Sequence, residues 1–395
     1  MAHNRLDERT TVVAGGALLA VAVIAAAMNL RPAVTSVAPL LGEMRDTLGT
    51  SATWAGVLTS LPPLCFAAAG LAAPRLSARI GLGRMISLAL LLLTVGLGVR
   101  ALDGPYLMLG ATLVACAGIA LANVLIPVVI KSSFPARIGL MTGVYTAALQ
   151  GGGAMGSAIA PGTEDLLGGW RQALTVWAVL AFVALVIWIP AQRRHRATWR
   201  VEEASGRRSL LRNPLAWAVT LFFGCQSFVA YIVMGWLPQV FIDSGIGKLE
   251  AGALVGLTSL VGVPIALLVT PLAARSAAQS GWVIALGVVG ATGVVGVMLA
   301  PAAAPWLWSA LIGVGMSAFS LAVAIIALRA RDAEDTAQLS GMAQGLGYLF
   351  ASTGPFLFGL LHDLTDGWTV PFILFLAVYT VQILAGVVAG RDRHV

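Results

Sequence analysis

The stretch TVVAGGALLAVAVIAAAMNLRPAVTSVAPLLG occupies residues 11–42 and carries a single charged side chain, Arg31. About 20 apolar residues suffice for a helix to cross the ~30 Å hydrocarbon core of a bilayer. This stretch is therefore long enough and apolar enough to span a membrane. A guanidinium in such a span costs roughly 2.5 to 3.5 kcal/mol to insert, so something must offset that cost. Arg31 is therefore the first candidate for a functional residue.

The whole chain has the composition of a membrane protein. Of its 395 residues, 58% are hydrophobic and only 10% are charged. Helices and closed barrels are the structures that satisfy their own backbone in lipid, and these runs are apolar all round, which favours helices. We predict an all-α membrane protein with twelve transmembrane helices, at about 11–38, 52–73, 84–101, 106–130, 138–160, 170–190, 214–241, 249–273, 281–300, 303–328, 337–361 and 368–389.

The positions of the basic residues predict an orientation. If the amino terminus is cytoplasmic, 19 of the 24 Lys and Arg residues fall in cytoplasmic segments. The positive-inside rule then places both termini in the cytoplasm, with the chain a multi-pass protein of the cell membrane. The basic loops account for the net charge of +7, so no nucleic-acid partner is expected. The outer segments hold only Arg45, Arg100, Arg171 and Lys248.

The second half of the chain repeats the first at an offset of about 198 residues. The offset brings Gly143 onto Gly341, Asp165 onto Asp363 and Trp170 onto Trp368. An even number of helices per repeat gives both halves the same orientation, which is the parallel-repeat arrangement of many transporters. We predict two pseudo-symmetric six-helix halves, 1–190 and 214–395, joined by an Arg-rich cytoplasmic linker at 191–213.

Several short motifs identify a family resemblance. They are Asn29-Leu30-Arg31-Pro32 with Pro39, Trp236-Leu237-Pro238, Ala251-Gly252, Leu339 to Gly345 with Gly347-Tyr348, and Gly354-Pro355. On these residues the chain resembles major facilitator superfamily transporters, and within them the branch of cyanate and 2-nitroimidazole transporters. The resemblance covers nearly the full length. It implies the major facilitator fold and a substrate that is a small anion or a small polar heteroaromatic.

Two polar stripes predict where a substrate would bind. Gln344 and Tyr348 lie one turn apart on the same helix face, and Gln150 ends a matching stripe in the first half. The repeat offset brings Gln150 onto Tyr348, and both lie near the middle of their spans. We expect these three side chains to line a central cavity. The alternative is that they hydrogen-bond to neighbouring helices and stabilise packing.

Four further polar residues are weaker candidates for the same cavity. Gln226 and Tyr231 lie in the seventh predicted span and point about 100° or more apart around the helix. Asn123 precedes Pro127 and either contacts ligand or satisfies a carbonyl that the proline frees. Thr35 shares a helix face with Arg31.

The sequence also limits the chemistry. Apart from Glu250, at the outer edge of the span at 249–273, no Asp or Glu falls within a predicted span, and no nucleotide-binding P-loop or His/Glu zinc pattern occurs. We expect no enzymatic activity, no cofactor and no metal, a monomer, and coupling to a co-transported or exchanged proton or anion, or no coupling at all.

Two functions remain open. The first is a secondary active transporter of a small anion or polar compound, working by alternating access with Arg31 as charge partner. The second is an exporter or importer of a neutral heteroaromatic compound, with Tyr348 stacking and Gln344 hydrogen-bonding. For Arg31 the structural alternative is a guanidinium bonded to carbonyls of a neighbouring helix or reaching the outer interface.

Overall fold

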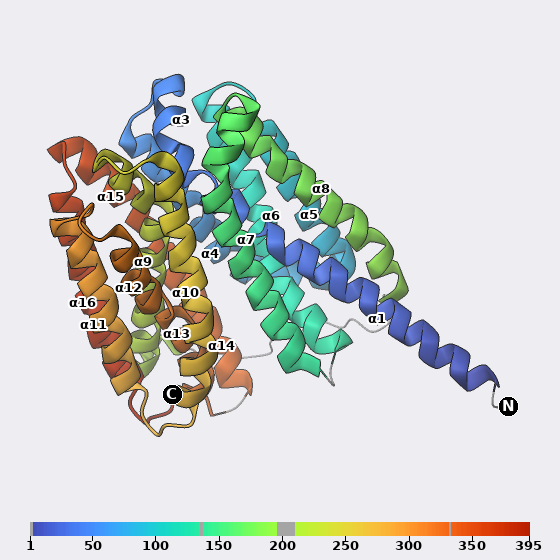
Figure 1. Cartoon of the computed structure of the whole chain (residues 1–395). Coiled ribbons are helices and arrows are strands. Elements are labelled where there is room, and N and C mark those ends of the chain that lie inside the picture. The colour runs from blue at the N-terminus through green and yellow to red at the C-terminus, as the bar shows by residue number, and fades with distance from the viewer. Residues whose placement is uncertain (1–2, 135–136, 196–209, 332) are drawn as a thin grey trace.

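The computed structural model describes the chain except for residues 1–2, 135–136, 196–209 and 332. The described residues form helices joined by short connections, and no strand occurs among them. Figure 1 shows two groups of helices, one coloured blue to green and the other yellow to red. The predicted linker at 191–213 lies mostly outside the described residues, so its boundaries stay a prediction.

The amino-terminal group contains the helices of residues 3–195. A short segment with α2 and η1 follows the first long helix. Pro127 lies inside α6, and Pro161 lies inside α7. The elements are α1 (His3–Asn29), α2 (Pro32–Thr35), η1 (Ala38–Leu40), α3 (Leu41–Leu48), α4 (Ala52–Ile80), α5 (Leu82–Val99), α6 (Pro105–Ser133), α7 (Ile138–Leu167) and α8 (Trp170–His195).

The carboxy-terminal group contains the helices from residue 210 onward. Two of its predicted spans are interrupted, at Ser317 and at Ser352, where one helix ends and the next begins. The elements are η3 (Leu210–Arg212), α9 (Pro214–Asp243), α10 (Lys248–Ala274), α11 (Ser280–Leu299), α12 (Pro305–Met316), α13 (Ala318–Arg329), α14 (Ala333–Ala351), α15 (Thr353–Thr365) and α16 (Thr369–Ala389).

Ten helical segments among the described residues are long and apolar enough to cross a membrane. The two remaining predicted spans are helical as well, but they are not among these ten. They correspond to α7 and to α14 with α15, which are the helices that carry the predicted polar stripes. The all-helical prediction is therefore confirmed.

The first predicted span is not one continuous helix. α1 ends at Asn29 and a new turn, α2, begins at Pro32, with Arg31 at the junction. Proline has no N–H to donate to the preceding turn, which explains why the helix breaks there. A second short break precedes Pro39 in η1. The charged residue thus lies in a helix interruption rather than on the wall of a long straight helix.

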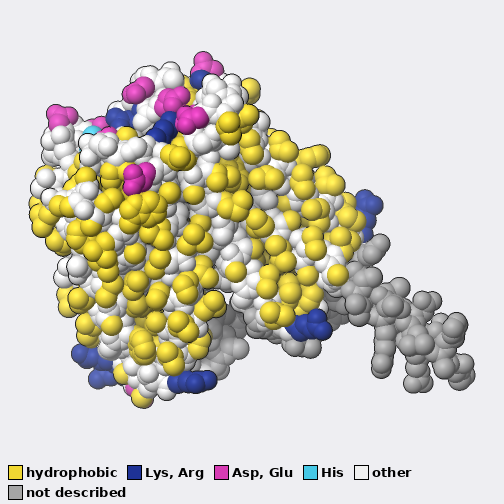
Figure 2. Space-filling model, viewed as in Figure 1, with side chains coloured by type: hydrophobic (Ala, Val, Ile, Leu, Met, Phe, Trp, Pro, Cys, Tyr) yellow, Lys and Arg dark blue, Asp and Glu magenta, His cyan; other side chains and the backbone are white. Residues whose placement is uncertain are grey.

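The two groups meet closely at the end of the molecule that carries α3, here called the α3 end. There α4 packs against α15, and α7 packs against α10. Ser157 Oγ donates to Gly252 O at 3.0 Å across the second of these contacts. Figure 2 shows Asp and Glu gathered at the α3 end, Lys and Arg at the opposite end, and a hydrophobic belt between them.

Candidate functional site

The helix break at Arg31 rests on a glycine patch of α7. A Cβ added at Gly152 would lie 2.3 Å from Met28 O, and one at Gly156 would lie 2.4 Å from Thr35 Oγ1. No real side chain tolerates contacts that short, so the two backbones approach this closely only because both positions are glycine. The stem of Arg31 lies along Gly153, whose added Cβ would be 3.1 Å from Arg31 Cδ. The glycine patch therefore fixes the position of the backbone from which the Arg31 side chain extends.

A second arginine holds the break from the other side. Arg100, the C-cap of α5, is fully buried, and its Nη1 donates to Ala33 O at 2.6 Å. That carbonyl is free to accept because Val37 N bonds to Val34 O instead of closing the next helical turn. The sequence placed Arg100 among outer-segment residues, and its position at the end of α5 is compatible with that assignment. The sequence did not indicate that its side chain is buried against the helix break.

Arg31 itself has no polar partner within the described part of the chain. No hydrogen bond or ion pair is made there to its guanidinium, which is partly buried. The groups that interact with it electrostatically are three tyrosines: Tyr231 of α9, Tyr348 of α14 and Tyr145 of α7. They come from both helix groups. The structure thus brings three of the sequence candidates, Arg31, Tyr231 and Tyr348, to one place between the groups, with Tyr145 beside them.

Aromatic rings surround Tyr348. Its ring centroid lies 5.3 Å from that of Phe66 on α4 and 5.1 Å from that of Phe223 on α9. The ring centroid of Tyr231 lies 6.5 Å from that of Tyr348. Centroid separations of 4.5–7 Å are typical of favourable aromatic pairs. A cationic side chain beside such rings forms a site with one charged and one aromatic wall.

The other predicted site residues have varied surroundings. Asn123 Oδ1 accepts from Tyr145 Oη at 2.7 Å, which leaves its predicted role at Pro127 without a bond to support it. Thr35 Oγ1 donates to Gly153 O at 2.8 Å and so contributes to packing. Gln344 donates to Ser340 Oγ on its own helix at 2.7 Å, and both residues are partly buried.

The two remaining glutamines differ from each other. Gln150 has a buried Oε1 that accepts no hydrogen bond in the described structure, so it retains an unused acceptor. Gln226 is 1% exposed and bonds to Gln382 of α16 at 2.5 Å and weakly to Met316 O at 3.5 Å. The structure therefore does not bring Gln226 to the Arg31 cluster, because its amide is directed into the interior of the carboxy-terminal group.

The sequence did not predict the contacts that two acidic residues, Asp363 and Glu164, make at the α3 end. Asp363 of α15 accepts from Ala52 N at 3.0 Å and from the N–H and hydroxyl of Thr53, so it caps the first turn of α4 in the other helix group. The sequence assigned Glu164 to an outer loop, beyond the predicted span at 138–160. In the structure α7 continues to Leu167, so Glu164 is helical, and it is only 4% exposed.

The sequence matches a known family over most of its length. Residues 17–355 match the family described as Major Facilitator Superfamily. The chain belongs to this superfamily. An uncharacterised transporter of Bacillus subtilis is 38% identical to this chain, and the match covers 100% of this chain and 96% of the relative. A 2-nitroimidazole transporter of Escherichia coli is 36% identical, with 96% of each chain covered.

A third relative is a cyanate transporter, the other kind of protein in the predicted branch. The cyanate transport protein of Escherichia coli is 30% identical and covers 86% of this chain and 89% of that protein. The resemblance inferred from the motifs around Arg31, Trp236 and Tyr348 is thereby confirmed. This major facilitator protein is a multi-pass membrane protein of a transporter family.

Solved structures support the fold alone. A nucleoside transporter mutant superposes with a TM-score of 0.74 at 11% identity, covering 93% of this chain and 98% of that one. A bacterial homologue of the lysosomal transporter Spinster gives a TM-score of 0.71 at 15% identity, with 98% of both chains covered. At such identities the likeness extends to the helix arrangement and not to the substrate.

Proposed function

We propose that this protein is a secondary transporter of a small anion or a small electronegative polar compound, with Arg31 as the charge partner of the substrate. The single observation that carries the proposal is the guanidinium of Arg31, held at a helix break between the two groups without a described hydrogen-bond or ionic partner. A cation kept in an apolar region without a fixed partner is suited to an anion that binds and leaves. Suitable ligands are a cyanate-like anion, a small carboxylate or a nitro-heteroaromatic.

Transport would proceed by alternating access. The protein would span the plasma membrane with both termini in the cytoplasm. The basic end seen in Figure 2 supports this orientation through the positive-inside rule. The packing of α4 on α15 and α7 on α10 supports an α3 end that is closed to the outside.

A ligand panel tests the proposal directly. Purified protein in detergent is heated with cyanate, acetate, 2-nitroimidazole, unsubstituted imidazole or choline, and the melting temperature is measured. A ligand that binds only the folded state raises the free energy of unfolding by RT ln(1 + [L]/Kd). We expect cyanate, acetate or 2-nitroimidazole to stabilise and choline to have no effect. Stabilisation by choline alone would contradict the proposal.

The aromatic wall supports a second candidate, a carrier of neutral heteroaromatic compounds. The ring centroids of Phe66 and Phe223 lie 5.3 Å and 5.1 Å from that of Tyr348, so the three rings offer faces and edges to a ligand. In this case ring stacking, with a hydrogen bond from Gln344, would supply most of the binding energy rather than the charge of Arg31.

Substitution of Tyr348 separates the two candidates. Tyr348→Leu removes an aromatic pair worth roughly 0.5–1.5 kcal/mol, so the affinity for 2-nitroimidazole should fall by about 2- to 10-fold. Tyr348→Phe keeps the ring and serves as the matched control. Isothermal titration with cyanate and with 2-nitroimidazole provides the comparison. If Tyr348→Leu weakens both ligands equally, the ring does not discriminate between them and the second candidate loses its support.

A further inference from the structure

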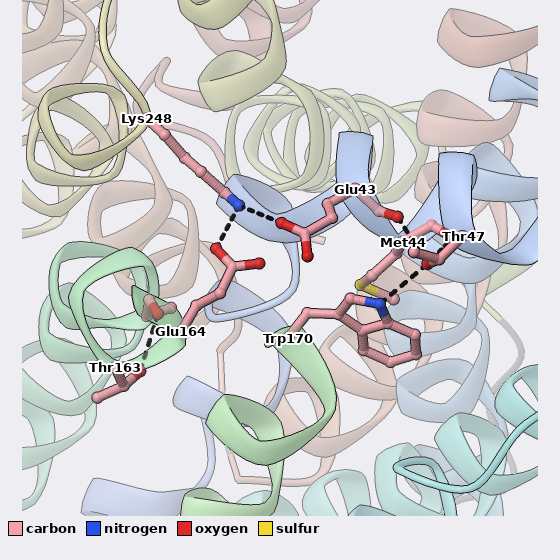
Figure 3. Close-up of polar contacts among 8 residues, drawn as sticks. Glu43, Met44, Thr47, Thr163, Glu164, Trp170 and Lys248 are labelled. Atoms are coloured by element: carbon pink, nitrogen blue, oxygen red, sulfur yellow. Dashed lines mark hydrogen bonds and ion pairs between the residues drawn. The ribbon is translucent and has the colours of Figure 1, made fainter. Parts of the chain in front are cut away.

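A cluster of three charged residues joins the two helix groups at the α3 end, and Figure 3 shows its geometry. Lys248, the first residue of α10, directs its Nζ between two carboxylates. It lies 2.9 Å from Glu43 Oε2 on α3 and also forms an ion pair with Glu164 Oε2 on α7. Both acids belong to the amino-terminal group and the lysine to the carboxy-terminal group. Any opening between α7 and α10 must therefore separate these charges.

The charges in the cluster do not balance. Two carboxylates face one ammonium, and the Glu164 side chain is only 5% exposed, compared with 42% for Glu43 and 31% for Lys248. Glu164 Oε1 is buried and receives no hydrogen bond from any residue that the structure describes. A buried carboxylate oxygen without a donor is costly, and a proton supplies the missing donor. The buried, unpartnered oxygen thus marks a site for one proton next to Glu43.

The electrostatics of the site agree with its geometry. Burial and the neighbouring Glu43 raise the pKa of Glu164 to about 7, against the opposing effect of Lys248. The pKa of Glu43 is lowered, chiefly by its hydrogen bond with Glu164 and then by Lys248. The two acids therefore titrate as a pair that binds one proton near neutral pH.

Several charged groups lie near these elements. Arg45 of α3 is half-buried and acts electrostatically on Asp363 and His362. On α8, Arg171 pairs with Asp103, and on α10, Glu250 accepts from Trp306 Nε1 at 2.9 Å. Asp165, the neighbour of Glu164 on α7, is exposed. The charges that act on the Glu164 carboxyl are those of Lys248 and Glu43.

We propose that Glu43, Glu164 and Lys248 form a proton-binding latch: one proton, shared between the two carboxyl groups, is bound when the α3 end closes and is released when it opens. Opening hydrates Glu164 and separates it from Glu43, so its pKa returns toward its ordinary value near 4.5. Because the pKa is higher in the closed form, protonation favours the closed form. The open-to-closed ratio should then rise with pH by about tenfold per unit between the two pKa values.

The role of the latch in transport rests on the proposed alternating access. It would make outward opening sensitive to the proton concentration at the α3 end, and it would do so with carboxylates that lie outside the predicted spans. Acidic conditions at that end should slow opening, and neutral to alkaline conditions should favour it.

Infrared titration of the full-length protein in lipid nanodiscs tests proton binding directly. We expect the carbonyl band of a protonated carboxyl group to disappear with a midpoint near pH 7 and to be absent in Glu164→Gln. Glu43→Gln should move the midpoint to lower pH, and Lys248→Met should move it to higher pH, because Glu43 raises and Lys248 lowers the affinity for the proton. Asp165→Asn is the matched control and should leave the band unchanged. A band that persists in Glu164→Gln overturns the proposal.

A distance measurement tests the coupling to opening. Spin labels at Tyr106→Cys and Leu299→Cys, both exposed positions in different groups, report the separation at the α3 end after Cys65, Cys116 and Cys225 are replaced by alanine. The long-distance population should grow about tenfold per unit between pH 5 and 7, and Glu164→Gln should abolish the growth. An unchanged pH response in Glu164→Gln overturns the latch. Neither readout needs a substrate, so both remain valid if Arg31 proves not to bind one.

Discussion

Arg31→Ala is expected to lower the affinity for the transported compound by about 10- to 100-fold. A hydrogen bond to a charged group contributes roughly 1.5–3 kcal/mol, and 1.4 kcal/mol corresponds to a factor of ten in affinity. No described side chain or carbonyl hydrogen-bonds to the guanidinium. When the guanidinium is removed, therefore, no such partner is in place to bind the substrate instead. The loss should appear in titrations with whichever panel ligand stabilises the protein, and in its uptake by proteoliposomes.

Arg31→Lys refines the same experiment. Lysine keeps the positive charge but lacks the planar fork that holds a carboxylate or nitro group through two parallel bonds. Affinity should therefore fall part of the way. Arg275→Ala is the matched control, since it removes one exposed arginine at the end of α10 and should leave affinity unchanged. Full affinity in Arg31→Ala would refute the role of Arg31 as charge partner.

Gly156→Ala is expected to have the second large effect, on both stability and binding. The added methyl group would lie 2.4 Å from Thr35 Oγ1 and 2.7 Å from Pro32 Cα, so α2 must move away from α7. Overpacking of this kind costs typically 1–3 kcal/mol. Because α2 directly follows Arg31, the shift also displaces the guanidinium from its three tyrosines. We expect a lower melting temperature together with weaker ligand affinity.

A glycine of the same helix provides the control. Gly143 has no atom within 4 Å of an added Cβ, so Gly143→Ala should be neutral or slightly stabilising. Adding Thr35→Ala to Gly156→Ala removes the nearest contact but leaves Pro32 in place, and it should restore part of the lost stability. If Gly156→Ala melts and binds like Gly143→Ala, the glycine patch does not position Arg31.

Much of the architecture was predictable because it depends on local chemistry. Apolar runs of about 20 residues predict membrane helices wherever they occur, and the offset of Gly143 to Gly341 predicts a duplicated arrangement. Arg31 could be singled out for the same reason, as a lone charge between Thr11 and Gly42. The family resemblance pointed to Tyr348, which does lie beside Arg31.

The rest depended on contacts between segments far apart in the chain. Hydropathy cannot distinguish Arg100, which is buried against Ala33, from an arginine anchored at the surface. It likewise assigned Glu164 to an outer loop without indicating that the end of α7 buries this residue beside Lys248. Gln226 shared the mid-span position of the cavity candidates, yet its partner Gln382 is 156 positions away and inside one helix group.

The sequence by itself determined that this is a helical membrane protein, because composition and hydropathy are properties of the chain. Its short motifs indicated the major facilitator superfamily, and its one charge between Thr11 and Gly42 singled out Arg31. Only the tertiary structure decided which polar groups meet. Whether a side chain faces a partner, a packed interior or an open site depends on how the helices rotate and lean against one another. The close glycine contacts of α7 set that rotation for Arg31, and no pattern along the chain specifies which carbonyl or hydroxyl lies opposite them.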